Sequence, residues 1–231
     1  MIIKEKNEGC SIELTSEVKL NKSYLFFKRM FDLFAALVAF VVLFVPMLLL
    51  FFIIRFESKG SAIYSQVRMG KDGVPFVFYK FRSMYIDTPV CASRDLVNAD
   101  SYITKVGKFM RKTSLDELPQ LINIIKGDMS FIGPRPVILA ETELIEKRMR
   151  GGAYAVSPGL TGYAQINGRD FVGIDSKAEY DCFYAHNLSL KMDIKIFLKT
   201  IMYVLRCTDI NEGTVEKKVD TEVKEESTNV R

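Results

Sequence analysis

The sequence has no tryptophan, a single histidine (His186) and four cysteines that lie far apart. Such widely spaced cysteines argue against a disulfide framework or a zinc ribbon, and one histidine argues against a His-rich metal site. The chain also lacks a Walker-type phosphate loop, a dinucleotide-binding glycine motif and an Asp-x-Asp pair. These absences disfavour the P-loop, Rossmann and common metal-dependent glycosyltransferase classes. Any chemistry is therefore expected from carboxylates, Arg and Lys, with or without a hard cation.

The 231 residues suit one domain with an accessory element. The formal charge of +4 is too small to indicate a nucleic-acid partner. Hydrophobic residues make up 48% of the chain although 26% is charged, so they must be concentrated somewhere. Residues 33–54 hold that concentration, because all 22 are apolar. A helix of this length is long enough to cross a hydrocarbon core of about 30 Å.

Basic residues flank this apolar run on both sides. Lys28 and Arg29 precede it, and Arg55 and Lys59 follow it, so the positive-inside preference selects no orientation. Pro46 lies near the middle and predicts a membrane kink, because proline removes a backbone hydrogen bond from a helix. We therefore predict a re-entrant helix hairpin. The alternatives are a kinked single span and a buried helix of a soluble domain.

The remaining sequence predicts an α+β fold, in which a small cytoplasmic domain of helices and a β-hairpin follows the membrane hairpin. Alternating residues at 62–68 and 74–84 flank a Gly-rich turn and predict the β-hairpin. Lysines at helical spacing in 101–112 and 190–205 predict amphipathic helices that lie on anionic headgroups or form simple solvated faces. The expected divisions are a loose lead-in at 1–20, a membrane-inserted kinked helix at 21–58, a cytoplasmic catalytic domain at 59–210 and a disordered tail at 211–231.

Two adjacent carboxylates, Asp116 and Glu117, lie at the start of a predicted helix that ends at Gly127. One interpretation is structural, because Ser114 and Glu117 have the spacing of a capping box. The other is chemical: one carboxylate attacks phosphorus, while the other acts as a base or helps to hold a divalent cation. The local sequence leaves both interpretations open.

Basic and amide side chains around this pair are candidates for substrate binding. Arg111 lies one turn upstream, and Arg135 stands between two prolines that restrict the backbone, which suits bidentate phosphate recognition. Lys80 and Arg82 share one face of a predicted strand. A glycine-punctuated loop at 157–169 carries amide and aromatic groups suited to a nucleobase. The candidates are Lys80, Arg82, Arg111, Arg135, Gln165 and Arg169.

Taken in order, these segments resemble the monotopic polyprenyl-phosphate phosphoglycosyl transferases, the bacterial sugar transferases that start glycan assembly on a membrane. The resemblance spans roughly residues 24–206. The matching text is KRMFD at 28–32, YKFRSM at 79–84, SLDELPQ at 114–120, KGDMS at 126–130, GPRP at 133–136, PGLTG at 158–162 and QINGR at 165–169.

This resemblance implies an enzyme that transfers a sugar 1-phosphate from a UDP-sugar to undecaprenyl phosphate and releases UMP. It implies a ping-pong reaction in which Asp116 carries the phosphosugar and Glu117 assists as acid/base. Mg²⁺ would bridge Asp116 and the diphosphate, and Arg111 and Arg135 would bind phosphates. The implied location is the cytoplasmic face of the bacterial inner membrane, with membrane lipids and downstream glycosyltransferases as partners. The implied pathways are capsule, exopolysaccharide or glycoprotein glycan assembly.

Two other functions fit parts of the sequence. A non-catalytic, membrane-anchored scaffold needs the apolar run and the basic helices but not the Asp116 and Glu117 pair. A conventional glycosyltransferase with a lipid acceptor would release UDP instead of UMP, and the missing Asp-x-Asp pair disfavours it. No motif specifies the sugar, because related hexoses differ by only a few contacts.

Overall fold

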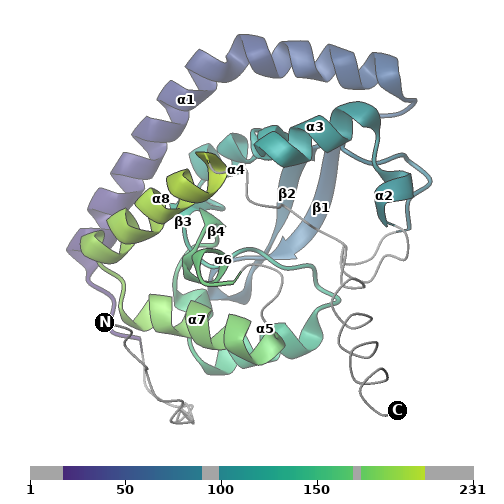
Figure 1. Ribbon diagram of the computed structural model, residues 1–231. Coiled ribbons are helices and arrows are strands. Elements are labelled where there is room, and N and C mark those ends of the chain that lie inside the picture. The colour runs from purple at the N-terminus through teal and green to yellow at the C-terminus, as the bar shows by residue number, and fades with distance from the viewer. Residues whose placement is uncertain (1–17, 90–98, 169–172, 206–231) are drawn as a thin grey trace, which may run out of the picture.

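The computed structural model describes residues 18–89, 99–168 and 173–205. Within these residues a long helix, α1 (Lys22–Glu57), curves around a body of shorter helices and two small sheets (Figure 1). This mixture of helix and strand agrees with the predicted α+β class. Most of the predicted lead-in, the predicted tail at 211–231 and Arg169 lie outside the described residues.

The predicted β-hairpin is confirmed. Strands β1 (Ile63–Met69) and β2 (Pro75–Phe81) pair antiparallel around the short turn η1 (Lys71–Gly73). A second sheet, which the sequence did not reveal, pairs β3 (Ser130–Ile132) with β4 (Gly159–Thr161) in parallel. Its strands are three residues long, too short for a periodic signal.

Helices and 3₁₀ turns make up the rest of the body. They are α2 (Ala99–Tyr102), α3 (Lys105–Thr113), η3 (Leu115–Glu117), α4 (Gln120–Lys126), α5 (Thr142–Arg150), η4 (Ala153–Ala155), α6 (Tyr163–Ile166), α7 (Ile174–His186) and α8 (Leu190–Leu205). The prediction of one helix over 101–112 is wrong at its start, because the segment forms two helices, α2 and α3, with a non-helical step between them. The cause is Thr104, which caps α3 by accepting a hydrogen bond from the Gly107 N–H at 2.9 Å.

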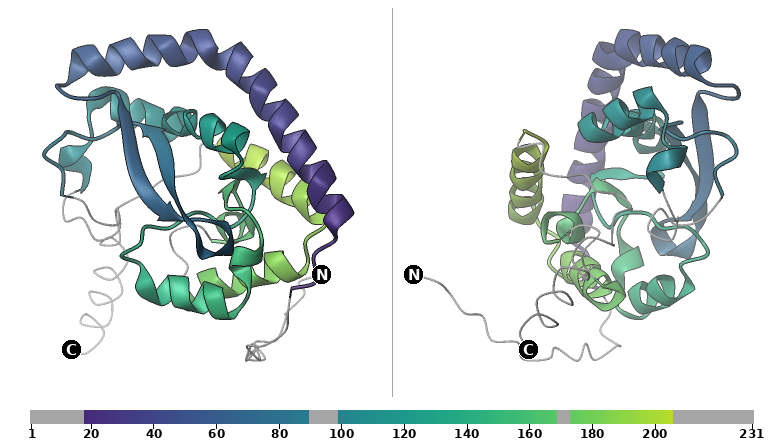
Figure 2. Two further views of the ribbon diagram at one scale, coloured as in Figure 1. Left: turned by 180° about the vertical axis from the view of Figure 1, so that it is seen from behind. Right: turned by 45° about the vertical axis from the view of Figure 1, so that its right-hand side comes forward.

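Helix α1 continues through Pro46 without interruption and is bent into two arms (Figures 1 and 2). The bend fits the hydrogen bond that proline removes from a helix interior. By length and composition α1 is able to cross a membrane, and only 11% of its most apolar 18-residue window is buried. A buried core helix would hide most of these side chains, so that alternative is not supported.

Both arms of α1 pack on the body through their inner side. Ala36 of the first arm contacts a buried cluster that contains Phe78 of β2 and Ile124 of α4. Ile54 of the second arm belongs to another cluster, which contains Met110 of α3. The outer side of the bend keeps its large apolar side chains exposed.

The basic pair before the apolar run makes internal contacts, where the sequence suggested only a charged flank. The Lys28 ammonium contacts the carboxylate of Asp193 on α8 at 2.6 Å. The Arg29 guanidinium donates to the carbonyls of Ile124 and Ile125 at 2.6 and 2.9 Å. These carbonyls belong to the last turn of α4, where a cation is favoured by the helix dipole. Arg29 therefore ties the membrane helix to α4.

Candidate active site

The Asp116 and Glu117 pair lies on the tight turn η3 between α3 and α4. Ser114, the C-cap of α3, forms the turn in the left-handed region, with φ 56° and ψ 20°, a conformation that is uncommon for non-glycine residues. Ser114 makes no side-chain capping bond, and the Glu117 carboxylate pairs with Arg135 instead. The capping-box interpretation is therefore wrong. Asp116 is 8% exposed on this turn.

The turn and the Arg135 loop meet through an ion pair. Nη2 of Arg135 lies 2.7 Å from Oε1 of Glu117, and both side chains are partly buried. A charge-assisted bond of this length fixes the guanidinium next to the carboxylate turn. Glu117 and Arg135, which are 18 positions apart in the sequence, thus lie side by side.

Close backbone contact holds the Arg135 loop against the β4 segment. The N–H of Gly133 donates to Thr161 O, and the N–H of Gly159 donates to Pro134 O, both at 2.9 Å. A Cβ on Gly133 would lie 2.2 Å from Ser157 O, so no larger residue fits without a backbone shift. These glycines bring the 133–136 and 158–162 segments together.

Two further arginines hold the backbone of the Arg135 loop, and sequence reasoning missed both. Nη1 of Arg148 donates to Arg135 O at 2.9 Å, and Nη1 of Arg68 donates to Pro136 O at 2.8 Å. Arg68 also stacks over the Phe78 ring at 4.2 Å. Burial and the positive charge of Arg135 lower the pKa of Arg68 to about 10. No local signal marked them, because their partners lie far away in the sequence.

Arg148 in turn depends on a buried carboxylate. It pairs with Asp181 of α7, and the two side chains are 3% and 0% exposed. Burial alone raises the pKa of Asp181, and the Arg148 charge opposes that rise. Arg148 of α5 therefore connects Asp181 of α7 to the Arg135 carbonyl. The pair supports the candidate site without being part of it.

Arg111 lies on α3, the helix that precedes η3. It is buried, and its Nε donates to Oγ of Ser83 at 3.0 Å. Helix α3 approaches Ser83 closely because Gly107 has no side chain: a Cβ there would lie 2.0 Å from Ser83 O. The backbone N–H of Thr104 also donates to Ser83 O at 3.1 Å. Gly107 thereby sets the position of Arg111.

Substituting Gly107 with alanine should force α3 away from Ser83, because backbone cannot yield as a flexible side chain does. We expect a loss of stability of about 1–3 kcal/mol and a fall in turnover of about tenfold or more, since small displacements of positioned groups cost activity. Gly173→Ala is the matched control, because among the described residues no atom beyond its chain neighbours lies within 4 Å of its new Cβ. Thermal melting measures the first effect, and an assay of the transfer that the sequence resemblance implies measures the second. Equal activity in the two variants would contradict this role of Gly107.

The other predicted binding residues are placed differently. Arg82 donates to Lys59 O and Ser58 O at 2.7 and 2.8 Å, so it joins β2 to the end of α1 instead of facing η3. Lys80 lies 5.3 Å from the centre of the Tyr64 ring. Gln165 of α6 donates to Leu160 O at 3.2 Å. Their contacts with substrate stay predictions.

A metal ion would find few protein ligands here. Among the described residues, no three His, Cys, Asp or Glu side chains gather into a possible metal site. Mg²⁺ commonly uses only one or two carboxylates and completes its shell with water and substrate phosphates. The sequence resemblance implies Asp116 as the carboxylate for such an ion, and this contact stays a prediction.

Comparisons against known proteins identify a family that covers most of this chain. The family of bacterial sugar transferases matches residues 23–207. The chain belongs to this family. The resemblance seen in the sequence is therefore confirmed over most of the chain.

The names of several relatives include undecaprenyl phosphate. The chain is 39% identical over 187 residues to an uncharacterized sugar transferase, EpsL, of Bacillus subtilis, which covers 80% of this chain and 89% of that protein. It is 38% identical over 200 residues to undecaprenyl-phosphate galactose phosphotransferase of Salmonella typhimurium, covering 80% and 42%. It is 35% identical over 208 residues to UDP-glucose:undecaprenyl-phosphate glucose-1-phosphate transferase of Klebsiella pneumoniae, covering 85% and 44%. The chain thus spans less than half the length of the latter two.

Proposed function

We propose that this protein transfers a sugar 1-phosphate from a UDP-sugar to undecaprenyl phosphate and releases UMP, as the first membrane step of capsule, exopolysaccharide or glycoprotein glycan assembly. The observation that carries the proposal is the strained turn that holds Asp116 beside the Glu117–Arg135 ion pair. The names of the Salmonella and Klebsiella relatives support the donor and acceptor classes.

In the proposed reaction, a carboxylate oxygen of Asp116 attacks the sugar-bearing phosphorus of the donor. The bond between that phosphorus and the bridging oxygen breaks, and UMP leaves with this oxygen. A phosphate oxygen of undecaprenyl phosphate then attacks the same phosphorus and frees the Asp116 carboxylate. Arg111 and Arg135 would stabilise the charge on the phosphates, because both are held in place by hydrogen bonds.

Two residues have more limited proposed roles. Glu117 would keep Arg135 oriented through the 2.7 Å ion pair and assist as acid/base. Asp116 would hold Mg²⁺ together with the donor diphosphate, and the ion would supply neutralisation of phosphate charge. The proposed roles of Glu117 and Mg²⁺ support the two phosphoryl transfers and require no further chemical step.

We further propose that α1 enters and leaves the membrane by the same face. Its first arm is bonded to α4 through Arg29, and its end is bonded to α3, where Oε1 of Glu57 accepts from the Val106 N–H at 2.9 Å. Helices α3 and α4 belong to one packed body, so both ends of α1 lie on the same side. This placement favours a re-entrant helix over a span, with the body at the cytoplasmic face.

Helix α8 would contribute a second membrane contact. It buries Asp193 and Ile196 and exposes Ile194, Phe197 and Leu198, with Lys191 and Lys195 also exposed. Apolar and cationic side chains on one exposed surface suit the boundary between acyl chains and anionic headgroups.

The reaction product provides the test. With a panel of UDP-sugars, Mg²⁺ and undecaprenyl phosphate in detergent, the protein should release UMP and form a polyprenyl diphosphate-linked sugar. Release of UDP would indicate plain glycosyl transfer and contradict the proposal. No nucleotide release with any donor, together with no thermal shift on donor binding, would favour a scaffold.

A further inference from the structure

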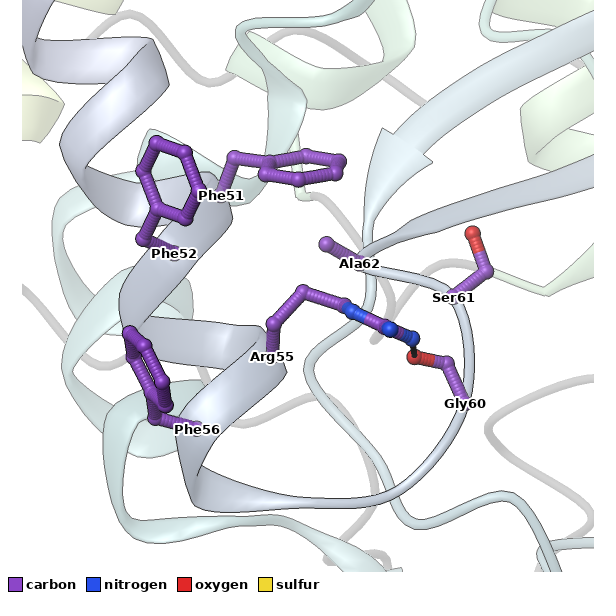
Figure 3. A pocket seen from close by; sticks show the side chains of 7 residues that line it. All are labelled: Phe51, Phe52, Arg55, Phe56, Gly60, Ser61 and Ala62. Atoms are coloured by element: carbon purple, nitrogen blue, oxygen red, sulfur yellow. Dashed lines mark hydrogen bonds between the residues drawn. The ribbon is translucent and has the colours of Figure 1, made fainter.

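A pocket of about 720 Å³ lies at the end of α1 (Figure 3). Its lining residues are Phe51, Phe52, Arg55 and Phe56 of α1 and Gly60, Ser61 and Ala62 of the segment leading to β1. Figure 3 shows the Arg55 side chain directed across the opening to Gly60, with Phe51 directed toward Ala62. The pocket therefore joins an aromatic side to a basic side.

The aromatic side is open to the surroundings. Phe52 is 49% exposed and Phe56, one turn further, is 87% exposed. They continue the apolar outer side of α1, which would face lipid in the membrane placement proposed above. Such a surface favours an alkyl or prenyl chain, because exposed aromatic area is unfavourable in water.

The basic side of the pocket is the Arg55 guanidinium next to the 58–60 segment. Nη1 of Arg55 donates to Gly60 O at 2.6 Å. The buried Arg82 guanidinium donates to the carbonyls of Ser58 and Lys59. Burial, followed by the positive charge of Arg55, lowers the pKa of Arg82. The Arg55 bond to Gly60 uses one of the five N–H donors of its guanidinium group. Its exposed side chain presents an edge suited to a phosphate.

The sequence places this pocket at a particular depth. The apolar run ends at Ile54, and Arg55 is the first charged residue after it. In the proposed membrane placement, the pocket therefore lies where the acyl chains meet the headgroups. A ligand there needs both an anionic head and an apolar tail.

We propose that this pocket binds the phosphate head of an anionic amphiphile, with Arg55 on the phosphate oxygens and the chain along Phe52 and Phe56. Undecaprenyl phosphate and an anionic phospholipid share this chemistry. Ala62 in the pocket wall belongs to the same buried cluster as Met110, on which Leu115 of η3 packs. The proposal rests on the membrane placement of α1 and not on the chemistry of Asp116.

Native mass spectrometry of the full chain in detergent, with added lipid and no UDP-sugar, tests the proposal. The two probes are undecaprenyl phosphate and dioleoyl phosphatidylglycerol. Arg55→Gln and Phe56→Ser should each weaken binding of at least one probe about tenfold. Matched controls are Lys71→Gln in the hairpin turn and Phe34→Ser, 69% exposed on the first arm, which should bind like the unmodified chain.

The two probes separate the possible sources of the phosphate. Weakening for undecaprenyl phosphate alone identifies the acceptor, whereas weakening for phosphatidylglycerol, alone or together with the acceptor, identifies a general lipid site. Unchanged binding of both probes by Arg55→Gln and Phe56→Ser overturns the proposal. Because no donor is present, a failure of the proposed transfer reaction would leave this result unaffected and would be seen only in the UMP assay.

Discussion

Asp116→Asn should abolish transfer, with turnover lower by on the order of 10⁴-fold or more, as expected when a nucleophile is removed. Asparagine keeps the size of the side chain but lacks the negatively charged oxygen that would attack phosphorus. Donor labelled in the sugar phosphate should leave label on the unmodified chain when acceptor is absent, and none on the variant. The measurements are UMP release and label retained on the denatured protein.

Asp72→Asn is the matched control for this variant. Asp72 is exposed in the hairpin turn with φ 55°, a conformation that asparagine adopts readily, so its activity should equal that of the unmodified chain. If Asp116→Asn keeps more than about a tenth of the activity, Asp116 is not the nucleophile. If it loses activity while label still accumulates on the protein, another residue carries the phosphosugar.

Asp181→Ala should strongly destabilise the body. It leaves the Arg148 guanidinium buried without its carboxylate, a situation that costs about 3–5 kcal/mol. For a chain of this size such a loss lowers the melting temperature by roughly 6–20 °C. Glu143→Ala, which breaks the exposed pair with Lys147, should leave the melting temperature unchanged.

A double variant separates stability from function at this pair. Arg148→Met with Asp181→Val replaces the two buried charges by apolar side chains, which should recover most of the lost stability. Transfer should stay reduced about tenfold or more, because no guanidinium then holds the Arg135 carbonyl. A double variant as unstable as Asp181→Ala would show that the cost does not come from an unpaired buried charge.

Features with a strong local pattern could be predicted from the sequence. The apolar run and Pro46 indicated a long kinked helix, and the alternation around a Gly-rich turn indicated the β1–β2 hairpin. Gly127 ends α4 in the left-handed region, with φ 98°, as its position predicted. In each case the residues that determine the structure are neighbours in the chain.

Features that depend on distant partners could not be predicted. Ser114 and Glu117 have capping-box spacing, but Arg135 competes for the Glu117 carboxylate from 18 residues away. Arg82 has the position of an anion ligand on its strand, yet the end of α1 uses its donors. Arg68 of β1 supports the Arg135 loop through Pro136 O, and no sequence motif marks it. Tertiary contacts, which a single sequence does not display, decide all of these roles.

The bond between Arg29 and the last carbonyls of α4 has a mechanical consequence. Helix α4 begins three residues after Glu117, so the Asp116 turn and α1 are joined by a short connection. In the proposed membrane placement, the height of Asp116 above the acyl chains then follows from the depth to which α1 is inserted. That insertion depth would tune how well a polyprenyl head meets a nucleotide arriving from water.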